Sequence, residues 1–252
     1  MAESIAARLY VTVPLAAGAK VTLDEGQAHY LRHVLRLGPG DFVAVFNGRD
    51  GEWSACIFSL GKRDATLAVE LLRRPQQQEA DLWLVFAPVK RAPIDAIAEK
   101  ATELGVSALW PVMTRRTVPA RVNLDRLAAQ ARAAAEQSER LSVPEIRASV
   151  PLDKAIAAWP ADRRLIVCDE SGRAPPAAEV LAGAPASPGG WAILTGPEGG
   201  FAPGELDAVL KLASATSISL GPRVLRADTA AIAAVAVFQA LAGDWRQARR
   251  PV

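Results

Sequence analysis

The first 74 residues alternate short apolar runs with turn signals. Runs suited to β-strands occur at residues 9–13, 20–23, 42–46, 53–58 and 66–72. Glycine, proline, asparagine and aspartate cluster between some of them, and the cluster at 47–51 has hairpin character. Asp24 is a candidate N-cap for a short helix through His33 and Leu35. Short strands at this spacing predict a small barrel.

The pattern changes after residue 80. Residues 82–87 are continuously apolar, as expected of a strand buried on both faces. A helix with apolar positions at helical spacing follows and ends at Gly105. The pattern predicts further strands and helices in turn, with strands at 108–113, 165–168, 191–195 and 217–220, and helices from Asn123 to about Leu141, at 204–212 and at 228–241. This alternation predicts a mostly parallel α/β sheet.

The polar, proline-bearing segment 74–80 has the composition of a linker. We therefore expect two domains, 1–74 and 80–252. The segment 174–190 is dense in alanine, proline and glycine and predicts a loop rather than another domain.

Composition narrows the class of protein. Half of the residues are hydrophobic and 22% are charged, which is typical of a globular chain. The two cysteines lie far apart and the two histidines leave little room for metal chemistry, so we expect no disulfide framework and no metal. The N-terminus has no signal-peptide pattern, and the longest apolar stretch, at about 230–238, is too short to span a bilayer. We therefore expect a cytoplasmic protein without a membrane segment.

The net charge is only +2, but 23 of the 29 basic residues are arginine, whose planar guanidinium suits bidentate phosphate contacts. The excess lies in residues 86–147, which hold 10 basic and 7 acidic side chains. In the first domain, His29, Arg32, His33 and Arg36 share a helical face. That face is either an RNA contact or a solvated helix surface.

Two glycine-rich segments carry the most specific signal. Residues 195–201 (TGPEGGF) follow a predicted strand and precede a helix, and residues 219–230 (SLGPRVLRADTA) repeat that arrangement. Glycines allow a ligand to approach the backbone, and two such loops at the carboxyl ends of parallel strands form a ligand crevice. The segments match neither the dinucleotide fingerprint nor the Walker pattern, and their apolar character suits an adenine ring better than a triphosphate. Asp228 is expected to be the N-cap of the last helix.

These segments, with several others, resemble the SPOUT-class methyltransferases, and within them the RsmE-type enzymes that methylate uracil N3 in 16S rRNA. The resemblance covers nearly the whole chain and is carried by residues 33–40 (HVLRLGPG), Lys90, 99–106 (EKATELGV), 136–140 (EQSER), 143–145 (VPE), 194–200 (LTGPEGG) and 220–230 (LGPRVLRADTA). There are two departures. Asp228 stands where the family often has glutamate, and Ser138-Glu139 stands where a Ser-Gly or Cys-Gly pair is common, which weakens any role for Gln137.

The resemblance implies a PUA-like small β-barrel over 1–74 and a SPOUT α/β domain over 80–252 with a deep trefoil knot. It implies S-adenosylmethionine as cofactor, a uridine of 16S rRNA in the small ribosomal subunit as substrate, and a homodimer. The alanine-rich composition of the last helix suits either packing against a partner or a place in the internal core. The implied cofactor-binding residues are Leu194, Thr195, Gly196, Pro197, Glu198, Gly199, Gly200, Leu220, Gly221, Leu225, Arg226 and Thr229. With the charge distribution, the RNA-binding candidates are Arg8, Arg32, Arg36, Lys90, Arg115 and Arg116.

Arg226 is the candidate catalytic residue. The N3–H of uracil must lose its proton before N3 attacks a methyl group, and an arginine near the base would stabilise the resulting anion. The alternative is that Arg226 only grips a phosphate or a backbone carbonyl. Glu136 and Arg140 are either a surface ion pair or a substrate contact.

Two other functions stay open at this point. One is a nucleotide hydrolase that uses the glycine-rich loops, although the chain lacks a Walker lysine and an obvious set of magnesium carboxylates. The other is a non-catalytic RNA-binding or assembly module.

Overall fold

The computed structural model describes residues 5–89, 91–119, 121–184 and 187–246. The chain forms two compact units. The first extends to Gln78 and includes Ala135–Val143, and the second comprises Glu79–Ala134 and the chain from Pro144 onward. The short segment Ala135–Val143 thus packs with the N-terminal unit, although the sequence pattern placed it in the second domain.

The first unit is built on a five-stranded sheet with the strand order β1-β3-β4-β5-β2. Its strands are β1 (Ile5–Tyr10), β2 (Lys20–Leu23), β3 (Phe42–Phe46), β4 (Glu52–Leu60) and β5 (Ala65–Arg74). Only β1 and β3 pair in parallel among the described strands of this sheet. Four of the five strands follow the predicted pattern, whereas the first lies four residues earlier than the apolar run at 9–13 indicated. The predicted hairpin at 47–51 is confirmed, because the Asn47 side chain accepts the N–H groups of Arg49 and Asp50 between β3 and β4.

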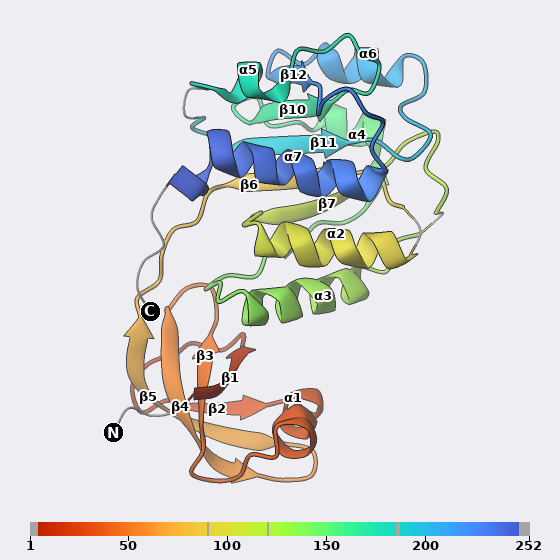
Figure 1. The fold of residues 1–252 in the computed structure, drawn as a ribbon. Helices are drawn as coiled ribbons and strands as arrows, with labels where there is room; N and C mark the ends of the chain where they lie inside the picture. The colour runs from red at the N-terminus through yellow and green to blue at the C-terminus, as the bar shows by residue number, and fades with distance from the viewer. Residues whose placement is uncertain (1–4, 90, 120, 185–186, 247–252) are drawn as a thin grey trace. The chain divides into compact units, whose positions relative to one another are not determined.

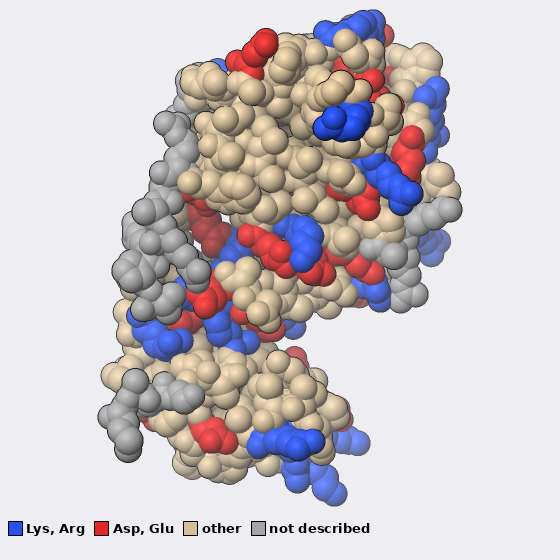
Figure 2. Space-filling model, in the orientation of Figure 1, with Lys and Arg blue, Asp and Glu red and all other residues tan. Residues whose placement is uncertain are grey.

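A short helix closes one end of this sheet (Figure 1). Asp24 caps α1 (Glu25–His29) in a capping box with Gln27, as the sequence predicts, and one π-helical turn, η1 (Tyr30–Val34), continues it. Leu31 is fully buried in the core with strand residues such as Val43 and Ile57. Lys and Arg side chains group on the outside of the first unit around α1 (Figure 2).

One buried carboxylate in the first unit, that of Glu52, binds several arginines. Glu52 on β4 is 1% exposed and accepts hydrogen bonds from Arg8 (2.6 Å), Arg73 (2.9 Å) and Arg74 (2.7 Å). Arg8 also donates to three carbonyl groups in the adjoining segment, those of Ala135, Glu136 and Arg140. Glu52 therefore fixes three arginines, and through Arg8 it links Ala135–Val143 to the strands of the first unit.

Replacing Glu52 with glutamine should lower the free energy of unfolding at pH 7 by about 1.5 kcal/mol, since hydrogen bonds to a charged group contribute about that much. Burial alone would raise the pKa of Glu52, but the hydrogen bonds and charges of Arg74 and Arg8 outweigh it and hold the pKa below its ordinary value. This contribution is therefore present above the ordinary carboxyl pKa and is lost as the pH falls through the lowered pKa.

Urea unfolding of the wild type and of Glu52→Gln checks this expectation. The difference should be fully present at pH 7 and shrink below about pH 4. Glu70→Gln is the matched control, because Glu70 is exposed on β5 of the same unit and has no hydrogen bond or ion pair among the described residues. A difference that stays constant with pH would show that the charge of Glu52 is not what stabilises the unit.

The second unit is built on a parallel sheet with the order β12-β10-β11-β6-β7-β8, and β9 also pairs with β7. Its strands are β6 (Leu82–Phe86), β7 (Ala108–Met113), β8 (Glu145–Ile146), β9 (Val150–Pro151), β10 (Arg164–Cys168), β11 (Trp191–Thr195) and β12 (Ala215–Ile218). The predicted parallel α/β sheet is confirmed. The strand expected at 217–220 starts two residues earlier, and the two-residue strands β8 and β9 have no signal in the sequence pattern.

Helices cover both faces of this sheet (Figure 1). The helices of this part of the chain are α2 (Arg91–Glu103), α4 (Leu152–Ala157), α5 (Ala177–Leu181), α6 (Glu205–Leu210), α7 (Ala227–Leu241) and the short 3-10 turn η2 (Asp244–Arg246). Another helix, α3 (Leu124–Gln137), ends in the segment that belongs to the first unit. On β11, Trp191 packs edge-on against Phe238 of α7, whereas Ala192 and Leu194 belong to a core with residues of α4 and α6. Alternate side chains of one strand thus meet helices on opposite faces. Within the described part of the chain, no helix has the length and apolarity needed to cross a membrane.

Three details of the helices differ from expectation. Asn123 caps α3 as predicted, but the helix ends at Gln137 rather than near Leu141, because Glu139 has left-handed backbone (φ 61°). The predicted loop 174–190 contains α5. Asp228 is not the N-cap of α7: Arg226 holds that position, and Asp228 accepts the N–H of Thr229 within the first turn.

Candidate functional site

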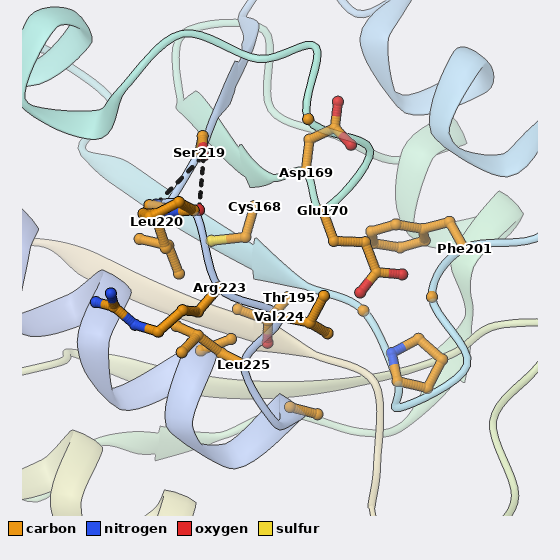
Figure 3. A pocket seen from close by; sticks show the side chains of 18 residues that line it. Cys168, Asp169, Glu170, Thr195, Phe201, Ser219, Leu220, Arg223, Val224 and Leu225 are labelled. Atoms are coloured by element: carbon orange, nitrogen blue, oxygen red, sulfur yellow. Dashed lines mark hydrogen bonds between the residues drawn. The ribbon is translucent and has the colours of Figure 1, made fainter.

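A cavity of about 180 Å³ lies where β10, β11 and β12 end (Figure 3). The three strands are parallel neighbours, so their carboxyl ends meet at one edge of the sheet, where open α/β sheets bind ligands. The lining residues come from the ends of the strands, from the loops that follow them and from the start of α7: Cys168, Asp169, Glu170 and Gly172; Thr195, Gly196, Pro197, Gly200 and Phe201; Ser219, Leu220, Gly221, Pro222, Arg223, Val224, Leu225, Ala227 and Ala230.

Glycine backbone forms much of the cavity wall. Gly200 has left-handed backbone (φ 66°), and a Cβ atom there would collide with the Glu170 carboxylate. A Cβ atom at Gly196 would lie 3.1 Å from the Phe201 ring. On the opposite wall, the Ser219 hydroxyl group bonds both the N–H and the carbonyl of Gly221, as the dashed lines in Figure 3 mark. The glycines therefore let backbone groups stand where side chains would fill the cavity.

The side chains of the cavity are apolar with a few charges. Asp169 accepts hydrogen bonds from the backbone N–H and the hydroxyl group of Ser171. Glu170 is exposed and has no hydrogen bond or ion pair among the described residues, and its carboxylate lies beside Phe201 in Figure 3. Burial raises the pKa of the Cys168 thiol to about 12, so it stays protonated at neutral pH and is no nucleophile. This lining suits a ligand with a flat apolar ring and several hydroxyl or amino groups.

The family follows from comparison with known proteins. A model of the RNA methyltransferase domain matches residues 76–239, and a model of the RNA methyltransferase PUA domain matches residues 23–70. The chain belongs to the RNA methyltransferase family. Its fold is therefore α/β with a PUA-like domain in the N-terminal unit.

Individual relatives agree over nearly the whole length of this RNA methyltransferase. The chain is 32% identical over 236 residues to the ribosomal RNA small subunit methyltransferase E of Rickettsia conorii, covering 93% of this chain and 95% of that one. It is similar to the crystal structure of the Neisseria gonorrhoeae ribosomal RNA small subunit methyltransferase E bound to S-adenosyl methionine, with a TM-score of 0.85, 26% identity and coverage of 95% and 99%. It is also similar to a putative methyltransferase from Legionella pneumophila in complex with SAM, with a TM-score of 0.83, 26% identity and coverage of 94% and 98%.

Seven of the residues expected at the cofactor line the cavity of this RNA methyltransferase: Thr195, Gly196, Pro197, Gly200, Leu220, Gly221 and Leu225. Five do not: Leu194, Glu198, Gly199, Arg226 and Thr229. Leu194 is buried in the core beneath the loop, and the other four are exposed.

The sequence pattern missed an entire wall of the cavity. The lining residues among 168–172 lie at the end of β10 and just after it, and the sequence predicts this strand, but nothing in the sequence shows that β10 lies between β11 and β12. Phe201 and the residues from Pro222 to Val224 also line the cavity. They lie within the two glycine-rich segments, so their place in these loops could have marked them as cofactor-binding candidates.

Arg226 does not line the cavity. Its two neighbours, Leu225 and Ala227, both line the cavity. Its own side chain is exposed, caps no helix N–H group, and has no hydrogen bond or ion pair within the described chain. A large side chain beside it, Val224, is 84% exposed. The guanidinium group is thus available to a molecule that approaches the cavity from outside.

The RNA-binding candidates fall into three groups. Arg32, Arg36, Arg115 and Arg116 are exposed, and Lys90 lies outside the described residues. The structure does not support Arg8 as an RNA-binding residue. Its side chain is only 12% exposed, and its N–H groups donate hydrogen bonds to Glu52 and to three backbone carbonyls, so Arg8 stabilises the fold. Glu136, which was weighed as a surface or substrate residue, accepts the backbone N–H of Tyr10.

Among the described residues, no three His, Cys, Asp or Glu side chains come close enough together to hold a metal ion.

Proposed function

We propose that this RNA methyltransferase transfers a methyl group from S-adenosylmethionine to N3 of a specific uridine in 16S rRNA of the small ribosomal subunit. The observation that carries the proposal is the glycine-walled cavity at the carboxyl edge of the parallel sheet. The relative from Neisseria gonorrhoeae, which is bound to S-adenosyl methionine, supports the choice of cofactor.

The residues present fit this cofactor. Leu220, Leu225 and the backbone of Gly221 would pack on the adenine ring, and the Gly196–Gly200 segment would bring backbone groups to the other end of the molecule. Asp169 and Glu170 are carboxylates suited to accept hydrogen bonds from hydroxyl or ammonium groups. We assign no cofactor contact to the five expected residues that do not line the cavity.

The bound cofactor supplies a methyl group already activated by a positively charged sulfur atom. What the chain must provide is a uracil whose N3 has lost its proton and is held in line with that methyl group. We assign to Arg226 the stabilisation of the negative charge that the deprotonated ring spreads over O2 and O4. Its exposed, uncommitted guanidinium group beside the cavity supports this role.

We propose that each unit contacts RNA separately, through Arg32 and Arg36 on the first and through Arg115 and Arg116 on the second. Lys90 lies outside the described residues and stays a candidate from the sequence alone. Arg32 makes one hydrogen bond, to the carbonyl of Gly61, and Arg116 makes one, to the carbonyl of Gly199, among the described residues. Each guanidinium group therefore keeps most of its five N–H donors for phosphate oxygens.

Three finer properties belong to the same proposal. A homodimer is supported by α7, where Ile232, Ala233, Ala236 and Val237 stay half-buried while the opposite face of the helix is core. A trefoil knot is in keeping with a sheet order that inserts β11 between β10 and β6. A ribosomal substrate implies a cytoplasmic enzyme.

Two measurements test the proposal. Mass mapping of 16S rRNA from a deletion strain should show one methyl group lost from a uridine and restored by the wild-type gene. Calorimetry should show that the protein binds S-adenosylmethionine and S-adenosylhomocysteine but not ATP. Binding of ATP alone would support a hydrolase, and rRNA binding without any change in methylation would support an assembly module.

A further inference from the structure

Glu205, the first residue of α6, joins two segments that are far apart in the sequence. Its Oε1 atom accepts the backbone N–H of Arg115 (2.8 Å), 90 positions away, in the turn that follows β7. Its Oε2 atom accepts the backbone N–H of Ala202 (2.7 Å), in the loop that follows β11. Ala202 is buried and comes directly after Phe201, which lines the cavity. The Glu205 carboxylate therefore links the turn after β7 to the loop after β11, which forms one wall of the cavity.

A second contact ties the same two segments. Arg116 donates a hydrogen bond from Nη1 to the carbonyl of Gly199 (2.7 Å), which belongs to the glycine-rich loop of the cavity wall. The turn itself is stiffened, because Thr117 donates its backbone N–H to the carbonyl of Thr114 and its hydroxyl oxygen accepts the N–H of Thr114. The wall is thus fastened at two points to a support with a defined shape.

The wall needs such a support because of its composition. Gly196, Gly199 and Gly200 lie within five residues, and glycine loses more conformational freedom on ordering than any other residue. Gly200 must also hold a left-handed conformation. Hydrogen bonds to an ionised carboxylate are stronger than neutral ones, so Glu205 is well suited to order this segment before a ligand arrives.

Acidic residues in the first turn of a helix are common, because they interact favourably with the helix dipole. That explanation does not account for the bond to Arg115, 90 positions away, which Glu205 makes in addition to its local bond to Ala202, three positions before it. Asp207 lies in the same first turn and is exposed, and no hydrogen bond or ion pair involves it among the described residues. Asp207 interacts with the helix dipole but lacks the hydrogen bonds that Glu205 makes to Arg115 and Ala202. A comparison of the two residues therefore distinguishes a dipole effect from an effect of these hydrogen bonds.

We propose that Glu205, assisted by Arg116, is a positioning residue for methyl transfer: it holds the Gly196–Ala202 wall in the shape that binds the cofactor, and touches neither cofactor nor RNA. The inference rests on the proposed function in one respect, that S-adenosylmethionine occupies this cavity. It assigns a role to a residue outside the cavity lining and outside the glycine-rich motif of the sequence.

The test compares Glu205→Gln with Asp207→Asn by calorimetry. Glutamine replaces one acceptor oxygen with an NH₂ group that faces an N–H donor, so one tie is lost while the side-chain size is kept. We expect Glu205→Gln to raise the Kd of S-adenosylmethionine about fivefold, as the loss of one net hydrogen bond predicts. Asp207→Asn removes the same charge from the same helix turn and should change that Kd by less than about twofold. Arg116→Met should give a smaller rise than Glu205→Gln.

Kinetics and hydrogen exchange complete the test. If Glu205 positions the wall, Glu205→Gln raises the KM of the cofactor and leaves kcat at saturating cofactor nearly unchanged. Amide exchange in the unliganded protein should also become faster at Arg115 and Ala202 in this variant alone. An unchanged Kd in Glu205→Gln, with or without a lower Tm, would overturn the inference. A wild-type protein that does not bind S-adenosylmethionine would instead overturn the proposed function, and the exchange data would still report on the two ties.

Discussion

Replacing Arg226 with alanine should leave the protein folded and lower kcat for methyl transfer about 10²- to 10³-fold, the usual effect of removing one group that stabilises a developing anion. The fold should tolerate the change because the side chain is exposed and makes no hydrogen bond or ion pair within the described residues. Its backbone carbonyl, which accepts the N–H of Ala230 at the start of α7, is kept in the variant. Single-turnover methylation of 16S rRNA at saturating cofactor measures the effect directly.

Two variants separate catalysis from simple charge. Lys211→Ala removes a positive charge from the exposed end of α6, where no side-chain contact involves it among the described residues, and should keep wild-type kcat. Arg226→Lys keeps the charge but loses the planar, bidentate donor set and should recover only part of the rate. If Arg226→Ala raised only the KM for RNA, the side chain would grip a phosphate instead. Wild-type turnover in that variant would remove Arg226 from the mechanism altogether.

The elements of the second unit could be predicted because their signals are local. A strand buried on both faces gives a continuous apolar run such as 82–87, and Asn123 marks a helix start by its own side chain. The order of the strands is not local. It decides that the residues after β10 complete the cavity, so Cys168, Asp169 and Glu170 could not be assigned from a pattern along the chain.

Sequence-based assignments of individual residues failed for the same reason, because the contacts that decide a residue's role join distant parts of the chain. Arg8 looked like a surface cation because its sequence neighbours do not reveal Glu52, which is 44 positions away and buried. The sequence gives no reason to single out Glu205, since an acidic residue at a helix start is common and its hydrogen-bond partners are visible only in the structure. The glycine motifs, in contrast, could be located from sequence because a ligand that approaches the backbone demands glycine itself at those positions.

Replacing Gly200 with alanine should raise the Kd of S-adenosylmethionine about 5- to 30-fold. A left-handed backbone is unfavourable for alanine by roughly 1–2 kcal/mol, and each 1.4 kcal/mol is tenfold in affinity where binding must restore that conformation. The new methyl group would also displace the Glu170 carboxylate, the exposed end of a flexible side chain that lines the cavity, which adds only a small cost. Both effects act on the wall that the cofactor must contact, so calorimetry with S-adenosylmethionine and S-adenosylhomocysteine should show the same loss for both ligands.

Gly204→Ala separates backbone strain from the cavity effect. Gly204 is also left-handed (φ 82°), but a Cβ atom there meets no atom within 4 Å, so alanine brings the strain without the collision. Its Kd should rise less than about threefold, while its Tm falls about as much as that of Gly200→Ala. Adding Glu170→Ala to Gly200→Ala should recover part of the affinity relative to the two single variants, because the collision is removed. A Gly200→Ala protein that binds the cofactor like wild type would show that this wall does not form the binding site.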